Sequence, residues 1–281
     1  MNITGLSTGF AKLDEKIMGF KPGEITVIAS RPGVGKTTFA MNIVECVALG
    51  QDIKGDAAKY DGGKRHPVLY FSLEVPANAL VSRLLANRAR VGLWRSRGDA
   101  DIDKERFEMK SRLVDAGDVL HYAPIFIEDD KSVPEISVIC EKAREAKRLH
   151  NVELIVIDYL EFIKNRGFAT RSRMEQVSSI VTGLKELAVE LSIHVILLAQ
   201  LSFSQPNGRD KKPTFSDLRS FPDAKQIADI VMFLHRPPHV NGEVNKDRAM
   251  AFVDIAKNSH GETGEVPLIF CCTCQSFFEQ P

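Results

Sequence analysis

Short apolar runs alternate along the chain with longer segments whose apolar residues recur at helical spacing. The short runs have the length and composition of buried strands, and they lie at 24–29, 67–74, 124–129, 152–158, 193–200, 227–234 and 250–257. The longer segments predict helices at 36–50, 76–91, 103–116, 133–149 and 173–191. The first helix is expected to end at Gly50, because glycine commonly closes a helix.

The order of these segments, strand followed by helix in repetition, predicts an α/β protein. Continuous apolar strands are typical of a mostly parallel sheet whose two faces are both covered by helices. The last strands, near 250–278, follow one another without a helix between them, so we expect an antiparallel extension there. No repeat, low-complexity tract or obvious linker divides the chain, and a single domain over residues 1–281 is the simpler interpretation.

Composition and charge narrow the class of protein. The chain is 44% hydrophobic and 26% charged, which is typical of a packed globular core. Lys plus Arg equals Asp plus Glu at 37 each, so any attraction to nucleic acid must come from a local basic surface. No apolar run approaches the ~20 residues that span a bilayer, and the N-terminus does not resemble a signal peptide. We therefore expect a soluble, cytoplasmic protein that does not act at a membrane.

The five cysteines are an odd number and do not indicate a disulfide framework. Cys271, Cys272 and Cys274 lie in the apolar run VPLIFCCTCQSFF, with no second Cys/His pair at zinc spacing. Free cysteine packs as a small hydrophobe, so the sequence favours cysteines buried in a strand over a structural zinc site.

The stretch ASRPGVGKTT at 29–38 contains the strongest candidate chemistry. It fits the phosphate-loop pattern G-x-x-x-x-G-K-[ST], with Ser30 at the first glycine position. The loop follows a predicted strand and opens a predicted helix, where loop amides and a helix N-terminus converge on phosphates. Lys36 would neutralise phosphate oxygens and the Thr37 hydroxyl would bind Mg²⁺. The predicted set for ATP and Mg²⁺ is Ser30, Arg31, Pro32, Gly33, Val34, Gly35, Lys36, Thr37 and Thr38.

Three further polar residues stand at the ends of predicted strands. Asp158 closes the run LIVID, where a Walker B aspartate would hold Mg²⁺. Glu74 comes just past a neighbouring strand and could activate the attacking water, whereas Gln200 could sense the γ-phosphate. Ligands of open α/β sheets bind at the carboxyl ends of the strands, so we expect these residues near Lys36. An ordinary polar strand end is the alternative for Glu74 and Gln200.

Five segments of the chain follow one another in the same order as the motifs of a known protein family. They are TGLSTGFAKLDEKIMGFKPGEITVIASRPGVGKTTFAMNIV, LYFSLEVP, LIVIDYLEFI, LKELAVELSIHVILLAQLS and PTFSDLRSFPDAKQIADIVMFLHRP. Together they resemble the C-terminal RecA-like motor domain of the DnaB-family replicative helicases over nearly the whole chain. RecA and circadian-clock ATPases share the phosphate loop but not the later combination. The resemblance implies a RecA-like P-loop NTPase fold.

The resemblance also implies a hexameric ring that encircles single-stranded DNA and moves along it using ATP. Association with another helicase chain or with a primase chain is a further expectation. The implied roles are Lys36 and Thr37 on phosphate and metal, Glu74 as catalytic carboxylate, Asp158 on Mg²⁺, Gln200 as sensor, Arg236 near the nucleotide base, and Lys257 as the lysine of the family's K-x-R-x-G motif.

Two basic loops follow strand ends on the predicted nucleotide side. The first, 164–174, carries Arg166, Arg171 and Arg173, and the second, 207–213, carries Arg209, Lys211 and Lys212. Positive charge in such loops suits contacts to phosphates along a strand of DNA, although a solvated loop is the alternative for each. By resemblance, Arg219 matches the family's DNA-contacting arginine.

The sequence departs from the family pattern in three ways. Ser220 and Pro222 replace Glu and Gly in the loop that contains Arg219, and proline there removes a backbone N–H. Ser259 occupies the position of the arginine that reaches the neighbouring subunit's γ-phosphate, and His260 or Arg248 are possible substitutes. The chain also begins at the motor domain, without the family's N-terminal domain and linker helix.

Three functions follow from these observations. The leading hypothesis is an ATP-dependent DNA helicase motor. The second is a helicase-like ATP-binding regulator, or an incomplete subunit with weak hydrolysis, which the departures at Ser259 and Pro222 motivate. The third is a RecA-like recombination or signalling ATPase. Stimulation of hydrolysis by single-stranded DNA separates the first from the second.

Overall fold

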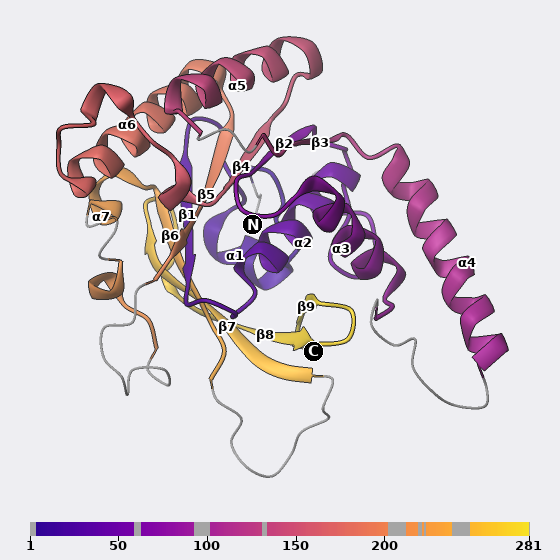
Figure 1. Cartoon of the computed structure of the whole chain (residues 1–281). Helices are drawn as coiled ribbons and strands as arrows, with labels where there is room; N and C mark the ends of the chain where they lie inside the picture. The colour runs from indigo at the N-terminus through magenta and orange to yellow at the C-terminus, as the bar shows by residue number, and fades with distance from the viewer. Residues whose placement is uncertain are drawn as a thin grey trace.

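A single nine-stranded sheet organises the chain (Figure 1). The computed structural model describes residues 4–58, 63–92, 102–130, 134–201, 212–218, 221, 223–237 and 248–280, without the side chains of 102–106. The strands are β1 Ile25–Ser30, β2 Val68–Ser72, β3 Ile125–Glu128, β4 Leu154–Asp158, β5 His194–Gln200, β6 Ile230–His235, β7 Arg248–Asn258, β8 Gly264–Cys271 and β9 Ser276–Glu279. Their order across the sheet is β3-β2-β4-β5-β1-β6-β7-β8-β9.

Strands β1 to β6 pair in parallel and β6 to β9 pair antiparallel. The predicted α/β class, with a mostly parallel sheet and an antiparallel C-terminal extension, is therefore confirmed. The parallel strands run as continuous apolar segments because both of their faces are covered.

Helices cover both faces of the parallel part. They are α1 Ala11–Ile17, α2 Lys36–Leu49, α3 Ala77–Ala89, α4 Ile102–His121, α5 Ile136–His150, α6 Arg173–Leu191 and α7 Ala224–Ile227, with short 3-10 turns η1 Leu160–Phe162, η2 Arg166–Phe168 and η4 Phe215–Asp217. Figure 1 shows α5 and α6 on one side of the sheet and α1, α2 and α3 on the other. Alternate residues of β4 enter the two cores, with Val156 facing α2 and Ile157 facing α6.

The sequence prediction missed α1 and one turn. Helix α1 has only two turns, below the length at which helical periodicity is informative. The predicted run of strand cysteines is wrong, because β8 ends at Cys271 and a turn closed by left-handed Gln275 leads into β9. Cys272 is exposed in that turn and Cys274 is buried, with its N–H 3.5 Å from the Cys271 sulfur.

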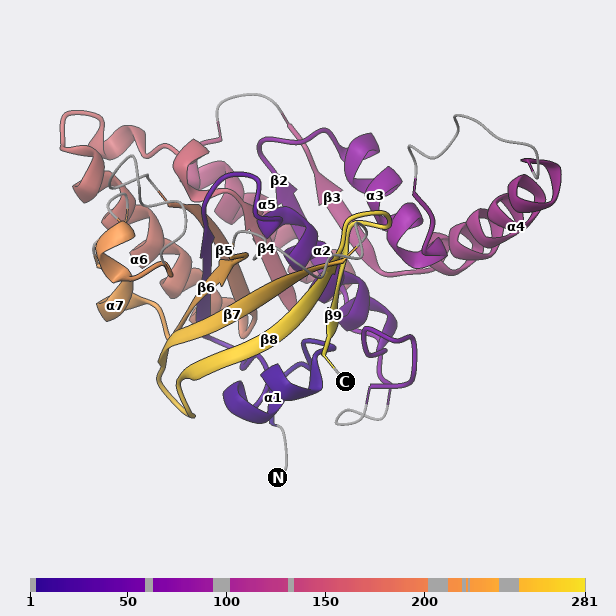
Figure 2. The ribbon, with the colours of Figure 1, turned by 90° about the horizontal axis from the view of Figure 1, so that it is seen from below.

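The C-terminal strands return to helix α2 (Figure 2). Phe277 of β9 packs on Phe39 of α2, with ring centroids 5.5 Å apart, and its N–H donates to the Asn42 side chain at 2.8 Å. The end of the chain therefore supports the helix that opens at the phosphate loop. None of the helices in the described segments is long and apolar enough to cross a membrane.

His194, the first residue of β5, connects its strand to β1 and to the segment that precedes β1. Its Nδ1 lies 2.8 Å from the Lys21 carbonyl and its Nε2 lies 2.9 Å from the Thr26 hydroxyl, so Nδ1–H donates and Nε2 accepts. The ring also stacks on Phe20 at 4.5 Å. The side chain is fully buried, and this burial lowers the pKa of His194 to about 4.

We expect His194 to make the protein less stable as the pH falls from 6.5 to 4. The folded state resists protonation, whereas the unfolded chain takes up the proton near the ordinary pKa of 6.5, so the contribution is complete above 6.5. The loss corresponds to about 3 kcal/mol. Urea unfolding of the wild type and of His194→Asn at several pH values measures this loss. The difference in free energy of unfolding between the two proteins should shrink as the pH falls.

The comparison with the variant is necessary because two carboxyls act in the opposite direction. Burial raises the pKa of Asp14 and of Glu45 to about 7, so each favours the folded state as the pH falls. A wild-type to variant difference that stayed constant from pH 7 to 4 would contradict the assignment of a buried, neutral His194.

Candidate functional site

The phosphate loop connects the carboxyl end of β1 to the first turn of α2. Gly35 precedes the helix with φ of 110°, and no side chain caps the first helical amides. Because the first amides of a helix have no partner within the helix, they remain available to an anion at this position. Gly33 has φ of 75°, so both glycines adopt a left-handed conformation that other residues rarely take.

Gly35 has a second reason to be glycine. A Cβ atom placed on it would lie 3.1 Å from the ring of Phe277 in β9. Ser30, in contrast, is the last residue of β1 and is 2% exposed, in ordinary strand conformation. The departure from glycine at Ser30 therefore does not disturb the loop.

The carboxylate of Asp158 is the centre of the polar network. Asp158 ends β4 and is 1% exposed. Its Oδ2 accepts hydrogen bonds from the Thr37 hydroxyl and the Tyr70 hydroxyl, each at 2.8 Å. Within the described part of the chain, its buried Oδ1 has no hydrogen-bond partner. A buried carboxylate with an unused oxygen, next to a hydroxyl, suits a divalent cation that takes oxygen ligands.

Lys36 stands at the opening of α2 beside this carboxylate. Its ammonium lies 4.4 Å from the centre of the Tyr159 ring. Burial lowers the pKa of Lys36, and the negative charges of Asp158, Glu161 and Glu74 oppose that shift. The ammonium is thus desolvated, which strengthens its attraction to a phosphate oxygen.

One cavity of about 410 Å³ brings the predicted residues together. Its lining is Ser30, Arg31, Pro32, Gly33, Gly35, Lys36, Thr37, Thr38, Glu74, Val75, Arg83, Gln200, Phe270 and Gln275. The predicted positions of Glu74 and Gln200 next to the loop agree with this cavity. Their chemical roles stay predictions.

Hydrogen bonds at both ends hold the segment that carries Glu74. Ser72 Oγ donates to the Val75 carbonyl, and the N–H of Ala77 donates to Asp129 at 2.8 Å. The Glu74 side chain itself is exposed to the cavity. Gln200 is positioned at the end of β5 by its own N–H, which donates to Glu161 at 2.9 Å.

Arg236 lies behind the loop after β6. Its guanidinium donates to the Gly33 carbonyl at 2.6 Å and stacks on Phe270 with 4.5 Å to the ring centre. Burial lowers the pKa of Arg236. Arg236 therefore contacts the phosphate loop, which is the position expected of a residue near the nucleotide. Its contact with the base of the nucleotide remains a prediction.

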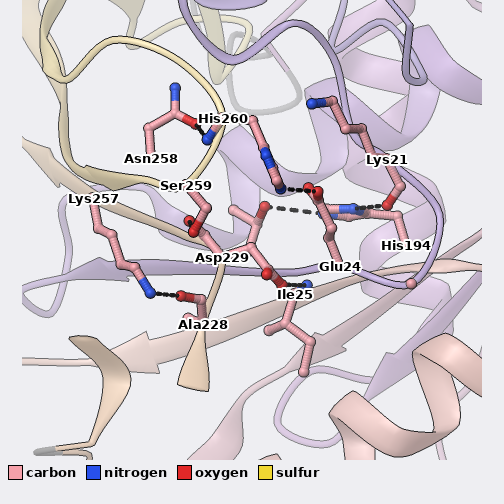
Figure 3. Close-up of polar contacts among 12 residues, drawn as sticks. Lys21, Glu24, Ile25, His194, Ala228, Asp229, Lys257, Asn258, Ser259 and His260 are labelled. Carbon is pink, nitrogen blue, oxygen red and sulfur yellow. Dashed lines mark hydrogen bonds and ion pairs between the residues drawn. The ribbon is translucent and has the colours of Figure 1, made fainter. Parts of the chain in front are cut away.

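Lys257 and Ser259 lie at the opposite end of the sheet from the loop of the same chain. Lys257 Nζ donates to the Ala228 carbonyl, and Ser259 Oγ donates to the Asp229 carbonyl at 3.0 Å (Figure 3). His260 pairs with Glu24 at 2.8 Å. A contact of Lys257 with nucleotide therefore requires the loop of a neighbouring copy. Arg248 begins β7 and is far along the strand from Ser259, so it is no substitute at that turn.

All three arginines of the first basic loop are exposed, and Arg173 is also held by hydrogen bonds. Arg166 is 83% exposed beside Glu135, and Arg171 is 63% exposed beside Glu175. Arg173 donates to the carbonyls of Ile163 at 3.1 Å and Glu161 at 2.9 Å, which holds the loop to η1.

The second basic loop is described only at its end. Lys212 Nζ lies 2.9 Å from Asp254 and 3.2 Å from Glu265, so two carboxylates balance its charge. Arg209, Lys211, Arg219, Ser220 and Pro222 lie outside the described residues.

Sequence reasoning did not place Tyr70, Arg83, Phe270 or Gln275 at the site. Tyr70 is one of several residues in an apolar run, and nothing in the sequence distinguishes it from the others. Phe270 and Gln275 reach the cavity only because β8 and β9 fold back to the phosphate loop. Within the described residues, no three of His, Cys, Asp or Glu are grouped as a metal site of their own.

Comparison with known proteins agrees with this geometry. The sequence profile described as DnaB-like helicase C terminal domain matches residues 5–279. The chain belongs to this family. The family makes the loop a nucleotide-binding loop, which the cavity at Lys36 and Thr37 suits.

Relatives and solved structures extend the comparison. The replicative DNA helicase DnaB of Pasteurella multocida is 36% identical over 95% of this chain and 54% of its own length, and that of Geobacillus stearothermophilus is 36% identical over 95% and 55%. The chain thus spans about half the length of the curated relatives it matches.

Two solved structures share the fold closely. One of them, an ATPase domain, superposes with a TM-score of 0.83 at 30% identity, covering 100% of this chain and 93% of that one. The other, a DnaB-like replicative helicase studied with its interactions with primase, gives 0.81 at 29% identity, covering 100% of this chain and 63% of that one.

Proposed function

We propose that this chain is the motor domain of a DNA helicase that hydrolyses ATP to move along single-stranded DNA. The observation that carries the proposal is the buried Asp158 carboxylate, which accepts hydrogen bonds from Tyr70 and Thr37, beside a cavity that Thr37 lines together with Lys36, Glu74 and Gln200. A buried carboxylate with an unused oxygen beside the loop is suited to hold the Mg²⁺ that phosphoryl transfer requires. The relatives named as replicative DNA helicases support the same activity.

Each residue has a task set by its position. The loop amides and Lys36 hold the phosphates, and Glu74 at the rim of the cavity orients the attacking water and accepts its proton. Gln200, at the end of β5, contacts the γ-phosphate and reports its loss to the loop after β5. Arg236 and Phe270 lie on the side of the loop away from Asp158, and we infer that the base of the nucleotide lies there.

Mg²⁺ fits the pair formed by Thr37 and Asp158. The unused Oδ1 of Asp158 and the Thr37 hydroxyl are oxygen ligands of the kind that this cation prefers. When bound, Mg²⁺ neutralises charge on the phosphate oxygens. Tyr70 fixes the carboxylate from the other side, so the metal ligands are oriented before nucleotide arrives.

We infer that copies assemble in a ring in which the turn at Lys257 to His260 meets the loop of a neighbouring copy. The location of this turn at the end of the sheet away from the chain's own loop supports the inference. Single-stranded DNA is the track, and Arg166 and Arg171 are exposed cations at the nucleotide side of β4 whose side chains are not committed to holding the loop. A primase chain or another helicase chain is a further partner, as the related structure studied with primase suggests.

A second candidate is an ATP-binding subunit with weak hydrolysis. It is favoured by Ser259, whose amide and hydroxyl are both used on the Asp229 carbonyl, so that this turn presents no arginine. Hydrolysis measured with and without DNA decides between the two candidates.

We expect ATP hydrolysis to rise with single-stranded DNA and to depend on Lys36 and Glu74. Lys36→Ala should abolish nucleotide binding and turnover, because it removes the cation at the phosphates. Glu74→Gln should keep binding and lower turnover about 10²- to 10⁴-fold, the usual effect of losing a catalytic base. A coupled phosphate-release assay and fluorescent ATP binding measure the two properties.

Arg144→Ala is the matched control, since Arg144 pairs with Glu190 on the surface at the far end of α6. Nucleotide binding with negligible turnover under both conditions would remove the motor proposal and leave the second candidate.

Tyr70→Phe should raise the Mg²⁺ concentration needed for half-maximal hydrolysis by about tenfold. The variant keeps the buried ring and removes only the hydroxyl that holds Asp158. Titration of Mg²⁺ at saturating ATP measures the shift, and Tyr122→Phe, on an exposed tyrosine, serves as the control. An unchanged Mg²⁺ midpoint would show that Tyr70 is only a packing residue.

Arg166→Ala combined with Arg171→Ala should weaken binding to single-stranded DNA at every sequence. Each lost phosphate contact lowers the slope of log affinity against log salt by about 0.7, so the pair should lower it by about 1.4. Fluorescence anisotropy at several salt concentrations gives the slope, with Arg144→Ala beside it. A slope equal to that of wild type would place the DNA elsewhere on the domain.

A further inference from the structure

Arg83 is a cation in the nucleotide cavity to which the proposed mechanism gives no task. It lies in the second turn of α3 and lines the same cavity as Lys36, Thr37 and Glu74. The residue is half-buried. In the segments that the structure describes, its guanidinium makes no hydrogen bond or ion pair. A partly desolvated arginine without a partner at the wall of an anion site is available to the anion.

Arg83 shares the wall of the cavity with Thr37, the residue that contacts Asp158. Its positive charge also opposes the rise in the pKa of Tyr70 that burial causes. The Tyr70 hydroxyl donates to Asp158, which also binds Thr37. The base side of the loop is different, since Arg236 and Phe270 stack there.

Phosphoryl transfer needs positive charge where the γ-phosphoryl group leaves. The turn at Ser259 provides no arginine, and its lysine and histidine are engaged, Lys257 with the Ala228 carbonyl and His260 with Glu24. Within the described residues that line the cavity, the cations are Arg31, Lys36 and Arg83. Lys36 is the lysine of the loop, and Arg31 is in the loop before its glycines.

We propose that Arg83 is a catalytic residue that stabilises the transferring γ-phosphoryl group from within the same chain, an inference that rests on the proposed function. In the step, the oxygen of water forms a bond to the γ-phosphorus while the bond from that phosphorus to the bridging oxygen breaks. The electron pair of the broken bond stays on ADP, the proton of water goes to Glu74, and phosphate is released. Arg83 pairs with the phosphoryl oxygens on which negative charge collects during the transfer.

The inference predicts a loss confined to the transition state. Arg83→Ala should lower kcat at least about 100-fold, the usual effect of removing one such donor, with the dissociation constant of Mg·ADP changed less than about threefold. Arg83→Lys should retain part of the rate, because it keeps the charge and loses the planar fork. Guanidinium ion at millimolar concentration should restore part of the activity to Arg83→Ala, which a merely structural role would not allow.

Binding of ADP with aluminium fluoride, which resembles the transferring phosphoryl group, provides a measurement independent of turnover. We expect Arg83→Ala to weaken that complex about 100-fold relative to ADP alone, and Arg144→Ala to leave it as in wild type. Thermal unfolding checks that each variant is folded.

Two outcomes would overturn the inference. One is an Arg83→Ala protein with kcat and aluminium fluoride affinity within about threefold of wild type, and the other is the same loss appearing in Arg31→Ala instead. A wild-type chain that binds no nucleotide would remove the proposed function itself, and the inference with it, which distinguishes the two failures.

Discussion

The carboxylate of Asp158 is the constraint on which the rest of the site depends. It ends β4, takes a hydroxyl from the first turn of α2 and a hydroxyl from β2, and its backbone carbonyl accepts the N–H of Leu73 at 2.8 Å. Three elements that are distant in the sequence are therefore held at one buried charge. Because an unsatisfied buried carboxylate oxygen is costly, the free Oδ1 is retained only where a ligand compensates it.

Much of this site could be predicted because parallel strands end at one edge. Once the strands that end at Ser30, Asp158 and Gln200 and the strand before Glu74 are recognised as parallel, their carboxyl ends are expected at one edge of the sheet. The residues come close together because β2, β4, β5 and β1 are consecutive in the sheet. The α/β class followed from the same alternation of strand and helix. Helix α2 ends where Gly50 predicts, with Gly50 in left-handed conformation.

The rest depended on contacts between residues far apart in the chain. Tyr70 looks like any residue of an apolar strand until β2 is placed next to β4. Lys212 reads as a basic loop residue until β7 and β8 bring Asp254 and Glu265 to it. Arg83 has the pattern of a solvated helix residue, and only the cavity beside α3 separates the two interpretations. The turn after Cys271 interrupts an apolar run because Gln275 adopts a left-handed conformation, which composition does not reveal.

The packing of Phe277 on the phosphate loop has a consequence for how the protein is made. The hydrogen bond from Phe277 to Asn42 joins residues 235 positions apart, and the ring of Phe277 fills the space beside Gly35. During synthesis the loop and α2 therefore leave the ribosome well before their packing partner, which is translated 235 residues after Asn42. A domain that emerges in order completes the support of its phosphate loop only after β9 has emerged, so the nascent motor cannot hold ATP in its final geometry before that point.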